Sequence, residues 1–298
     1  MKNFVRVVIF AMLLASPDCF AETLFSDDFE WGSDWNSSQG VTIPNNNGWS
    51  SLLMNNRGGS YEAGYVDTKN AKSGSRGFTQ YWDNTDSYGS AQECAFLKSS
   101  LSLPDEFFVG FNYKVDPNWA WGSASRLKIT RHYTSTSDSV IPTWSNFCAT
   151  CEDGEGNCTW TAGQQLPPSR CSSDMAVGLS DAKQWGACWN EVDDGEWHSF
   201  IYRYKHSTGE IQTWLDGIDI TSPTPPEQGY SGTGWDQSYG IRFGGNISDG
   251  GPASEYYTAY DDFIVATTKA EVDDFLGTGD EPESPGTTIR ASGTANWR

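Results

Sequence analysis

The sequence predicts an all-β protein in which two antiparallel sheets pack face to face as a sandwich. Short segments in which aromatic and β-branched residues alternate with other residues recur along the chain, and turn-forming residues separate them. Helical character is confined to Lys269–Leu276, enough for one or two turns. Strands at regular spacing with so little helix are typical of a two-sheet sandwich.

The clearest strand covers Phe107–Val115. Every second residue of this segment suits a core, namely Phe107, Val109, Phe111, Tyr113 and Val115. Asp116-Pro117-Asn118 then ends the strand, because proline has no N–H to donate to a ladder. Two tryptophans, Trp119 and Trp121, follow in the predicted turn.

A second strand follows the tryptophan turn and carries several cations. Alternation places Leu127 and Ile129 on one face, and it places Arg126, Lys128, Thr130 and His132 on the other. A cationic strand face is unusual in a chain whose formal net charge is −20. We interpret this face as a candidate binding surface, and the alternative is a solvated outer face of the sheet.

The remaining strands are predicted from similar patterns. They cover Leu24–Glu30, Phe78–Trp82, Gln92–Leu97, the hairpin of Trp197–Lys205 with Glu210–Leu215, then Tyr239–Phe243 and Ala259–Thr267. Residues 40–59 and 222–234 are rich in Gly, Pro, Asn and Ser, and we expect them to be mostly loop.

The chain ends are predicted to lie outside the domain formed by residues 22–277. Met1–Ala21 resembles a signal peptide, with Lys2 and Arg6 before an apolar segment and small residues at the cleavage position. This segment is too short for a stable membrane-spanning helix, and no later stretch is apolar enough. Residues 278–298 are rich in Gly, Pro, Ser, Thr and acidic residues, as in a disordered tail. The sequence therefore predicts a secreted or periplasmic protein.

Cysteines are concentrated in residues 134–192, which we interpret as an insertion without clear periodicity. Six cysteines remain after signal cleavage: Cys94, Cys148, Cys151, Cys158, Cys171 and Cys188. An even number in an exported chain favours disulfides, with fifteen possible connectivities. Cys148-x-x-Cys151 could instead belong to a zinc site, but the cluster has no second such pair and no histidine. We expect a disulfide-stapled insertion.

Three segments together resemble the concanavalin A-like jelly-roll superfamily of lectins, glucanases and polysaccharide lyases. They are FFVGFNYKVDPNWAWG, GEWHSFIYRYKHSTGEIQTWLDG and YDDFIVATT. The resemblance covers most of Leu24–Leu276 and implies a jelly roll with a concave groove. The order of extended strand, Asp-Pro, tryptophan turn and basic strand is most similar to alginate and glucuronan lyases. Arg126-Leu127 stand where those lyases carry Lys-Leu-Pro-Gly, and the Pro-Gly is absent.

This resemblance implies a set of site residues. A lyase neutralises a uronate carboxylate, removes the C5 proton and protonates the leaving oxygen. Arg126 and Lys128 would do the first, His132 would be the base, and Tyr202 or Tyr204 the acid. The predicted sugar-binding side chains are Trp119, Trp121, Gln80 and Trp185.

The segment Glu191-Val192-Asp193-Asp194-Gly195-Glu196 offers an alternative. It matches E-x-D-x-x-E, the carboxylate pattern of retaining glucanases with this fold. However, Asp194-Gly195 is a turn signal, and the segment directly precedes Trp197 instead of lying a strand earlier. We interpret it as a turn.

Asp28 and Asp262 are candidate ligands of a structural Ca²⁺ ion. The first and last strands are neighbours in this superfamily, and some members hold Ca²⁺ there through acids of both strands. Carboxylate oxygens are the hard ligands that Ca²⁺ prefers. The alternative is two exposed acidic residues.

The expected partner is a polysaccharide. The charge of −20 argues against nucleic-acid binding, and we expect neither a membrane partner nor an oligomer. The 14 tryptophans exceed what a core alone requires, and tryptophan stacks on sugar rings. The sequence leaves two main classes open, a polysaccharide lyase acting on a uronate polymer and a non-catalytic carbohydrate-binding module. A glucanase-like hydrolase is a distant third.

Overall fold

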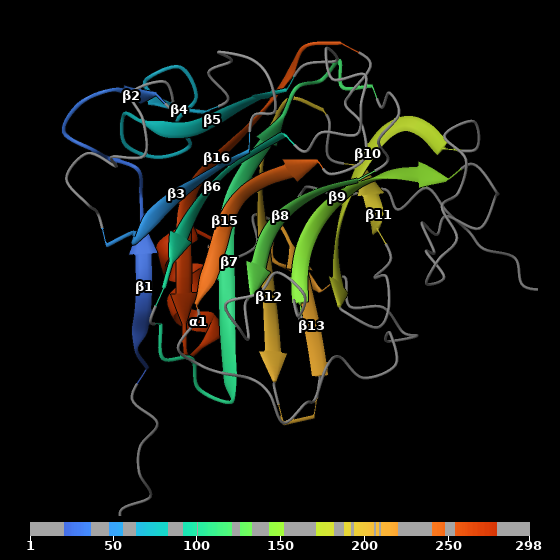
Figure 1. Cartoon of the computed structure of the whole chain (residues 1–298). Coiled ribbons are helices and arrows are strands. Elements are labelled where there is room, and N and C mark those ends of the chain that lie inside the picture. Colours follow the sequence, from blue (N-terminus) through green and yellow to red (C-terminus); the bar gives the residue numbers. More distant parts are fainter. Residues whose placement is uncertain are drawn as a thin grey trace, which may run out of the picture.

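The computed structural model is a sandwich of two antiparallel sheets, and the residues that it describes include one helix (Figure 1). It describes residues 21–36, 48–55, 64–82, 92–99, 101–120, 126–132, 143–151, 171–181, 188–191, 194–205, 207–208, 210–219, 240–247 and 254–278. The predicted all-β sandwich is confirmed. The predicted signal peptide, apart from Ala21, and the predicted tail, apart from Thr278, lie outside these residues.

The nine-stranded sheet contains the first and last strands of the fold. Its order is β14 (Ile218–Asp219), β13 (Glu210–Leu215), β12 (Trp197–Lys205), β7 (Glu106–Val115), β16 (Tyr256–Ala266), β5 (Gly77–Trp82), β4 (Gly64–Asp67) and β2 (Trp35–Asn36). β1 (Thr23–Asp27) pairs with the last strand, β16, as the resemblance implied.

The seven-stranded sheet forms the other layer. Its order is β11 (Cys188–Glu191), β10 (Cys171–Asp181), β9 (Thr143–Cys151), β8 (Arg126–His132), β15 (Ile241–Ile247), β6 (Gln92–Lys98) and β3 (Ser51–Asn55). The expectation that residues 134–192 lack regular strands is wrong, because this segment supplies β9, β10 and β11. β3 likewise lies within a segment expected to be mostly loop.

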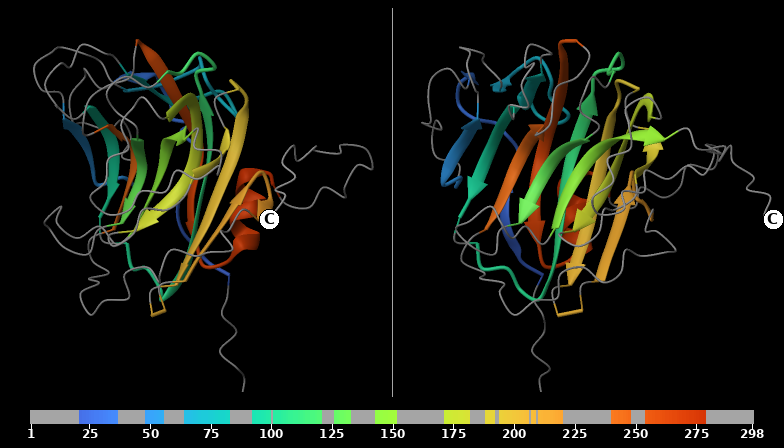
Figure 2. Two further views of the ribbon diagram at one scale, coloured as in Figure 1. Left: turned by 90° about the vertical axis from the view of Figure 1, so that its right-hand side faces the viewer. Right: turned by 45° about the vertical axis from the view of Figure 1, so that its right-hand side comes forward.

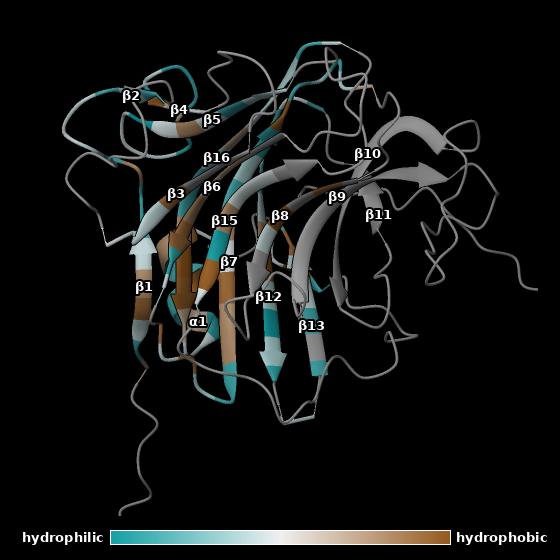
Figure 3. Cartoon of the chain, viewed as in Figure 1, coloured by the Kyte–Doolittle hydropathy of each residue, from teal (hydrophilic) through white to brown (hydrophobic). Residues whose placement is uncertain are grey.

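Aromatic side chains fill the space between the sheets. The Phe243 ring lies 4.4 Å from that of Phe263 and 5.3 Å from that of Phe111, joining β15 to strands of the opposite sheet. Figure 3 shows hydrophobic segments along β6, β7 and β15. Each buried ring removes a large apolar area from water. The alternation predicted for β7 is confirmed, since all five of its predicted core residues are buried.

Helix α1 (Lys269–Leu276) covers part of the outer face of the nine-stranded sheet (Figure 2). The Thr268 side chain caps its first turn, and Gly277 ends it in the left-handed conformation. Val272 and Leu276 pack over Gly110, where an added Cβ would lie 2.3 Å from Val272 Cγ1. In the part of the chain that the structure describes, no helix is long and apolar enough to span a membrane.

Candidate functional site

A β-bulge interrupts the alternation of β8. The pairing of β8 with β9 shifts register between Lys128 and Thr130. Leu127 and Ile129 are buried as predicted, but Thr130 is fully buried as well. Its hydroxyl lies 3.1 Å from the Tyr202 hydroxyl of the opposite sheet. The expectation that Thr130 lies on the cationic face is therefore wrong.

The bulge changes which residues of β8 share a face. Directly opposite residues of an antiparallel pair lie on the same side of a sheet. His132 pairs with Ile241, which is in the core, whereas Arg131 pairs with Arg242. By register, Arg131 and not His132 is the β8 residue that pairs with the cation Arg242. The role of His132 as a base stays a prediction, because its side chain lies outside what the structure describes.

The position of Arg242 is set by its neighbours in β15. Ile241 and Phe243 are both fully buried in the core, and Arg242 between them is partly exposed. Arg242 therefore lies on the outer face of the seven-stranded sheet. The sequence analysis did not single out Arg242. The pattern Ile-Arg-Phe, in which a cation lies between two core residues, could have predicted its outward position.

The register defines two rows across the outer face of the seven-stranded sheet. In the first, Lys128 pairs with Asn246 of β15 and with Asn146 of β9. In the second, Arg131 pairs with Arg242 of β15 and with Trp144 of β9. We call Arg126, Lys128, Arg131 and Arg242 the cationic positions. Arginine and lysine are residue types that bind carboxylate groups.

The two predicted general acids lie in the core. Tyr202 and Tyr204 are both fully buried on β12, on the side of the nine-stranded sheet that faces the other layer. Burial raises the pKa of the Tyr202 phenol far above its usual range, although the hydrogen bond with Thr130 opposes this. The predicted role of either tyrosine as an acid in an open groove is not supported, because neither phenol reaches a surface.

Two of the predicted sugar-binding side chains are buried. Gln80 spans the sandwich, donating to the Gly245 carbonyl at 3.1 Å and accepting from the Gly245 N–H at 2.7 Å. The ring of Trp119 is 3% exposed and lies 5.5 Å from that of Tyr256. Neither offers an open face to a sugar, so these two predictions are not supported. Trp121 and Trp185 lie outside the described residues.

The turn interpretation of the acidic segment is confirmed at Asp194–Glu196. Gly195 has a φ of 82°, and the Asp194 carboxylate accepts a hydrogen bond from the Glu196 N–H. Asp194 also binds His198 Nε2 at 3.0 Å, and Asp216 binds His198 Nδ1 at 2.8 Å. Burial lowers the pKa of His198, but the hydrogen bonds to Asp216 and Asp194 outweigh it and raise that pKa to about 9. These acids hold a cationic histidine between two turns.

The predicted calcium ligands differ in their surroundings. Asp28 is exposed, whereas Asp262 is 5% exposed in a bulge of β16 with a φ of 52°. The Asp262 carboxylate accepts hydrogen bonds from Ser73 Oγ and Asn112 Nδ2, each at 2.8 Å. Burial and the charge of Asp28 raise the pKa of Asp262, against these hydrogen bonds.

Asp261 adds a second buried carboxyl beside Asp262. It accepts hydrogen bonds from the Lys72 and Ser73 backbone N–H groups. Burial and the charge of Asp262 raise the pKa of Asp261 to about 8. A bound cation would relieve this repulsion, and the oxygen donors fit Ca²⁺. Within the described ranges, however, no three or more acidic, histidine or cysteine side chains form a metal-binding group.

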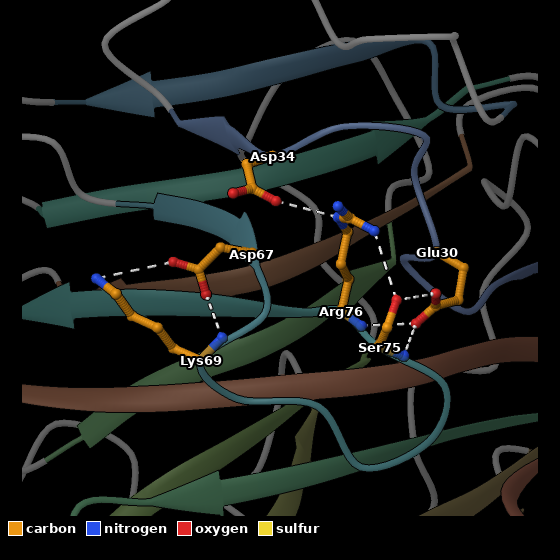
Figure 4. Close-up of polar contacts among 6 residues, drawn as sticks. All are labelled: Glu30, Asp34, Asp67, Lys69, Ser75 and Arg76. Carbon is orange, nitrogen blue, oxygen red and sulfur yellow. Dashed lines mark hydrogen bonds and ion pairs between the residues drawn. The ribbon is translucent and has the colours of Figure 1, made fainter.

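A third carboxylate anchors the same loop. Glu30 accepts hydrogen bonds from the backbone N–H groups of Ser75 and Arg76, and Arg76 Nε binds Asp34 at 3.1 Å (Figure 4). Gly74 is required here, because its φ is 55° and an added Cβ would collide with the Glu30 side chain. The loop before β5 is thus held by Asp261 and Asp262 before Gly74 and by Glu30 after it.

Comparison with known proteins gives structural matches. No protein-family model matches the sequence, and no curated protein does. An endo-β-1,4-glucuronan lyase from the fungus Trichoderma reesei is 15% identical, with a TM-score of 0.44, over 76% of this chain and 94% of that chain. A GH131 β-glucanase catalytic domain from Podospora anserina is 11% identical, with a TM-score of 0.49, over 82% and 95% of the two chains.

A third solved structure also matches the fold of this chain. Alginate lyase A1-II′, of polysaccharide lyase family 7, is 10% identical, with a TM-score of 0.41, over 70% of this chain and 84% of that chain. At such identities the likeness concerns the fold. The sandwich of two antiparallel sheets that the resemblance implied is seen in the structure itself.

Proposed function

We propose that this chain is an exported, monomeric protein that binds an acidic polysaccharide on the outer face of its seven-stranded sheet. The observation that carries the proposal is the placement of Arg131 directly opposite Arg242, with Lys128 in the neighbouring row. Like charges at directly opposite positions destabilise a sheet. A bound ligand of opposite charge would offset that cost. Uronate carboxylates suit arginine, whose guanidinium can hold both oxygens.

The net negative charge of the chain bears on which ligand can bind. At −20, the chain repels anionic polymers over long distances. A local group of cations is therefore needed for any acidic ligand to bind, and its attraction is screened by salt. Neutral sugars need no such group, so the cationic positions favour a uronate polymer over a neutral glucan.

Polysaccharide cleavage by β-elimination is the finer proposal. In that reaction a base removes the C5 proton, a C4–C5 double bond forms, and the C4–O bond breaks as the leaving oxygen gains a proton. Arg126 and Lys128 would neutralise the carboxylate that acidifies the C5 proton. The base and the acid would have to come from residues other than the buried Tyr202 and Tyr204. A binding module without catalysis is the second candidate, and it needs only the cationic positions.

One experiment separates these candidates. The purified protein is incubated with alginate, polyglucuronate and neutral glucans, while binding is measured by calorimetry and unsaturated products by ultraviolet absorbance. Binding to a polyuronate with a rise in absorbance supports the lyase, and binding without it supports the module. Absence of binding to every polyuronate would contradict both.

The matched variants are Arg242→Gln and Lys114→Gln. Each removes one positive charge, but Lys114 lies on β7 of the other sheet, opposite Trp197. We expect Arg242→Gln to weaken polyuronate binding about tenfold or more, as for a charge-assisted contact, and Lys114→Gln to leave it unchanged. Equal effects of the two variants would show that net charge, and not this face, controls binding.

A further inference from the structure

We propose that the outer face of the nine-stranded sheet carries a second carbohydrate-binding surface, formed by Tyr65, Tyr81 and Tyr257, which takes a neutral glycan chain. We call these residues the tyrosine row. The row lies on the opposite layer of the sandwich from the cationic positions and has a different ligand chemistry. It therefore stands independently of the proposed function.

The three tyrosines come from consecutive strands of the sheet. Tyr65 lies on β4, Tyr81 on β5 and Tyr257 on β16, and each is partly exposed. The residues beside them in sequence face the core or the opposite sheet, and among them are Val66, Gln80, Trp82 and Thr258. Since side chains alternate along a strand, the tyrosines share the outer face.

The row is continuous. Tyr81 and Tyr257 are directly opposite each other in the pairing of β5 with β16. The rings of Tyr65 and Tyr81 lie 5.4 Å apart at an interplanar angle of 87°. Neighbouring strands are about 4.8 Å apart, so the row extends about 10 Å from β4 to β16. That length suits a short run of consecutive sugar rings.

The rest of this sheet face differs from the row. Around Phe108, Ile201 and Ile264 the outer face is apolar and buried, because Val272 and Leu276 of α1 pack on it. The tyrosine row lies beyond that contact, and among the described residues no helix covers it. Partly exposed tyrosines combine an apolar ring face with a hydroxyl that reaches water, which the C–H face and hydroxyl rim of a sugar complement.

The charges around the row favour a neutral ligand. Lys69 Nζ lies 5.6 Å from the centre of the Tyr65 ring and 3.9 Å from Asp67 Oδ2, so this cation already has a carboxylate beside it (Figure 4). At the other end, burial and the charge of Asp116 raise the pKa of the Tyr257 phenol, which therefore stays protonated. A uronate polymer would meet these carboxylates, whereas a neutral sugar would not be repelled.

The test measures binding of cellohexaose and mannohexaose to the full chain by calorimetry. We expect Tyr81→Ala to weaken binding about tenfold, because the central ring is lost. Tyr81→Phe keeps the ring and should change binding less than about threefold. Polyuronate binding, measured in parallel, should be the same for both variants and the wild type.

Two results would overturn the proposal. One is a wild-type protein that binds neither hexasaccharide, and the other is unchanged affinity in Tyr81→Ala. If Tyr81→Ala does not fold, Tyr65→Ala on β4 provides the same comparison near the sheet edge. If the wild-type protein binds a neutral hexasaccharide but no polyuronate, the proposed function is contradicted and the proposal of the tyrosine row is not.

Discussion

Arg131 on β8 and Arg242 on β15 occupy directly opposite positions in the middle of the seven-stranded sheet. Like charges at directly opposite positions destabilise a sheet, and cross-strand pair energies are on the order of 0.2–1 kcal/mol. We interpret the arrangement as a conflict between stability and charge, of the kind that binding sites contain. A carboxylate placed between the two guanidinium groups would turn this conflict into an attraction.

Removing either arginine should separate binding from stability. We expect Arg131→Gln to raise the free energy of unfolding of the ligand-free protein by about 0.5 kcal/mol, because the repulsion is relieved. The same variant should weaken polyuronate binding. Urea unfolding and calorimetry, with the double variant Arg131→Gln/Arg242→Gln completing a cycle, measure both effects. A coupling energy showing that the two arginines stabilise each other would contradict the predicted repulsion.

The sequence predicts the strands of this site better than it predicts their faces. β7 and the β12–β13 hairpin are predicted almost residue by residue, because their alternation is unbroken from end to end. In β8 the bulge after Lys128 adds one residue, so Thr130 turns inward and Arg131 takes its place. Nothing in Leu-Lys-Ile-Thr-Arg marks that bulge locally, since it is set by pairing with β9 and β15.

The sequence does not predict the burial of Gln80 and Tyr202, for a related reason. Gln80 and Tyr202 look like surface groups in a sequence, because amides and phenols are usually placed near water. Here each finds its hydrogen-bond partner in the opposite sheet, at Gly245 and Thr130. Such partners are distant in sequence, and only the tertiary structure brings them together.

The Tyr202 hydroxyl should matter for stability and not for function. Tyr202→Phe leaves the buried Thr130 hydroxyl without this partner, and we expect a loss of about 1 kcal/mol in the free energy of unfolding. Polysaccharide binding and any lyase activity should be unchanged. Pairing the variant with Thr130→Val should recover part of the loss. A large fall in activity at wild-type stability would restore the predicted acid role.

His198 should make the protein less stable in alkaline solution. Its pKa is raised to about 9 in the folded protein from an ordinary value of 6.5. The stabilisation is therefore complete below about pH 6.5 and is lost as the pH rises through about 9. We expect the charged His198 to contribute about 2 kcal/mol to the free energy of unfolding. This value already allows for solvent screening, because both carboxylates are exposed.

Urea unfolding of the wild type and His198→Gln between pH 6 and pH 10 measures this contribution. The variant should be less stable at pH 6, and the difference should shrink towards pH 10. Asp194→Asn removes one of the two carboxylate partners and should show an intermediate effect. A pH-independent difference between the wild type and His198→Gln would mean that the ring acts through packing alone.

Cys151 and Cys171 should form a disulfide. They are directly opposite each other in the antiparallel pairing of β9 with β10. Opposite residues in such a pair have Cα atoms about 4.5–5.5 Å apart, within the range for a disulfide. Peptide mapping of the non-reduced protein should recover this pair, and Cys151→Ser/Cys171→Ser should lose about 3 kcal/mol of stability. Recovery of Cys151 joined to any other cysteine would contradict the prediction.

Calcium should stabilise the protein through Asp28 and Asp262. Asp261 and Asp262 are buried next to each other with raised pKa values, so their charged forms oppose folding at neutral pH. A cation near Asp28 and Asp262 would offset that repulsion. At a calcium concentration about 100-fold above Kd, the gain is about 2.7 kcal/mol, or a Tm higher by about 5–10 °C.

Thermal unfolding in calcium, in magnesium and in a chelator tests this. Magnesium should have a smaller effect, because it accepts an irregular set of oxygen ligands less readily than calcium. Asp28→Asn is the cleaner variant, since Asp28 is exposed and its replacement removes a ligand charge without disturbing the hydrogen bonds of Asp262. It should abolish the calcium response. If the wild type unfolds at the same temperature in calcium and in chelator, the two buried carboxyls are instead neutralised by protons.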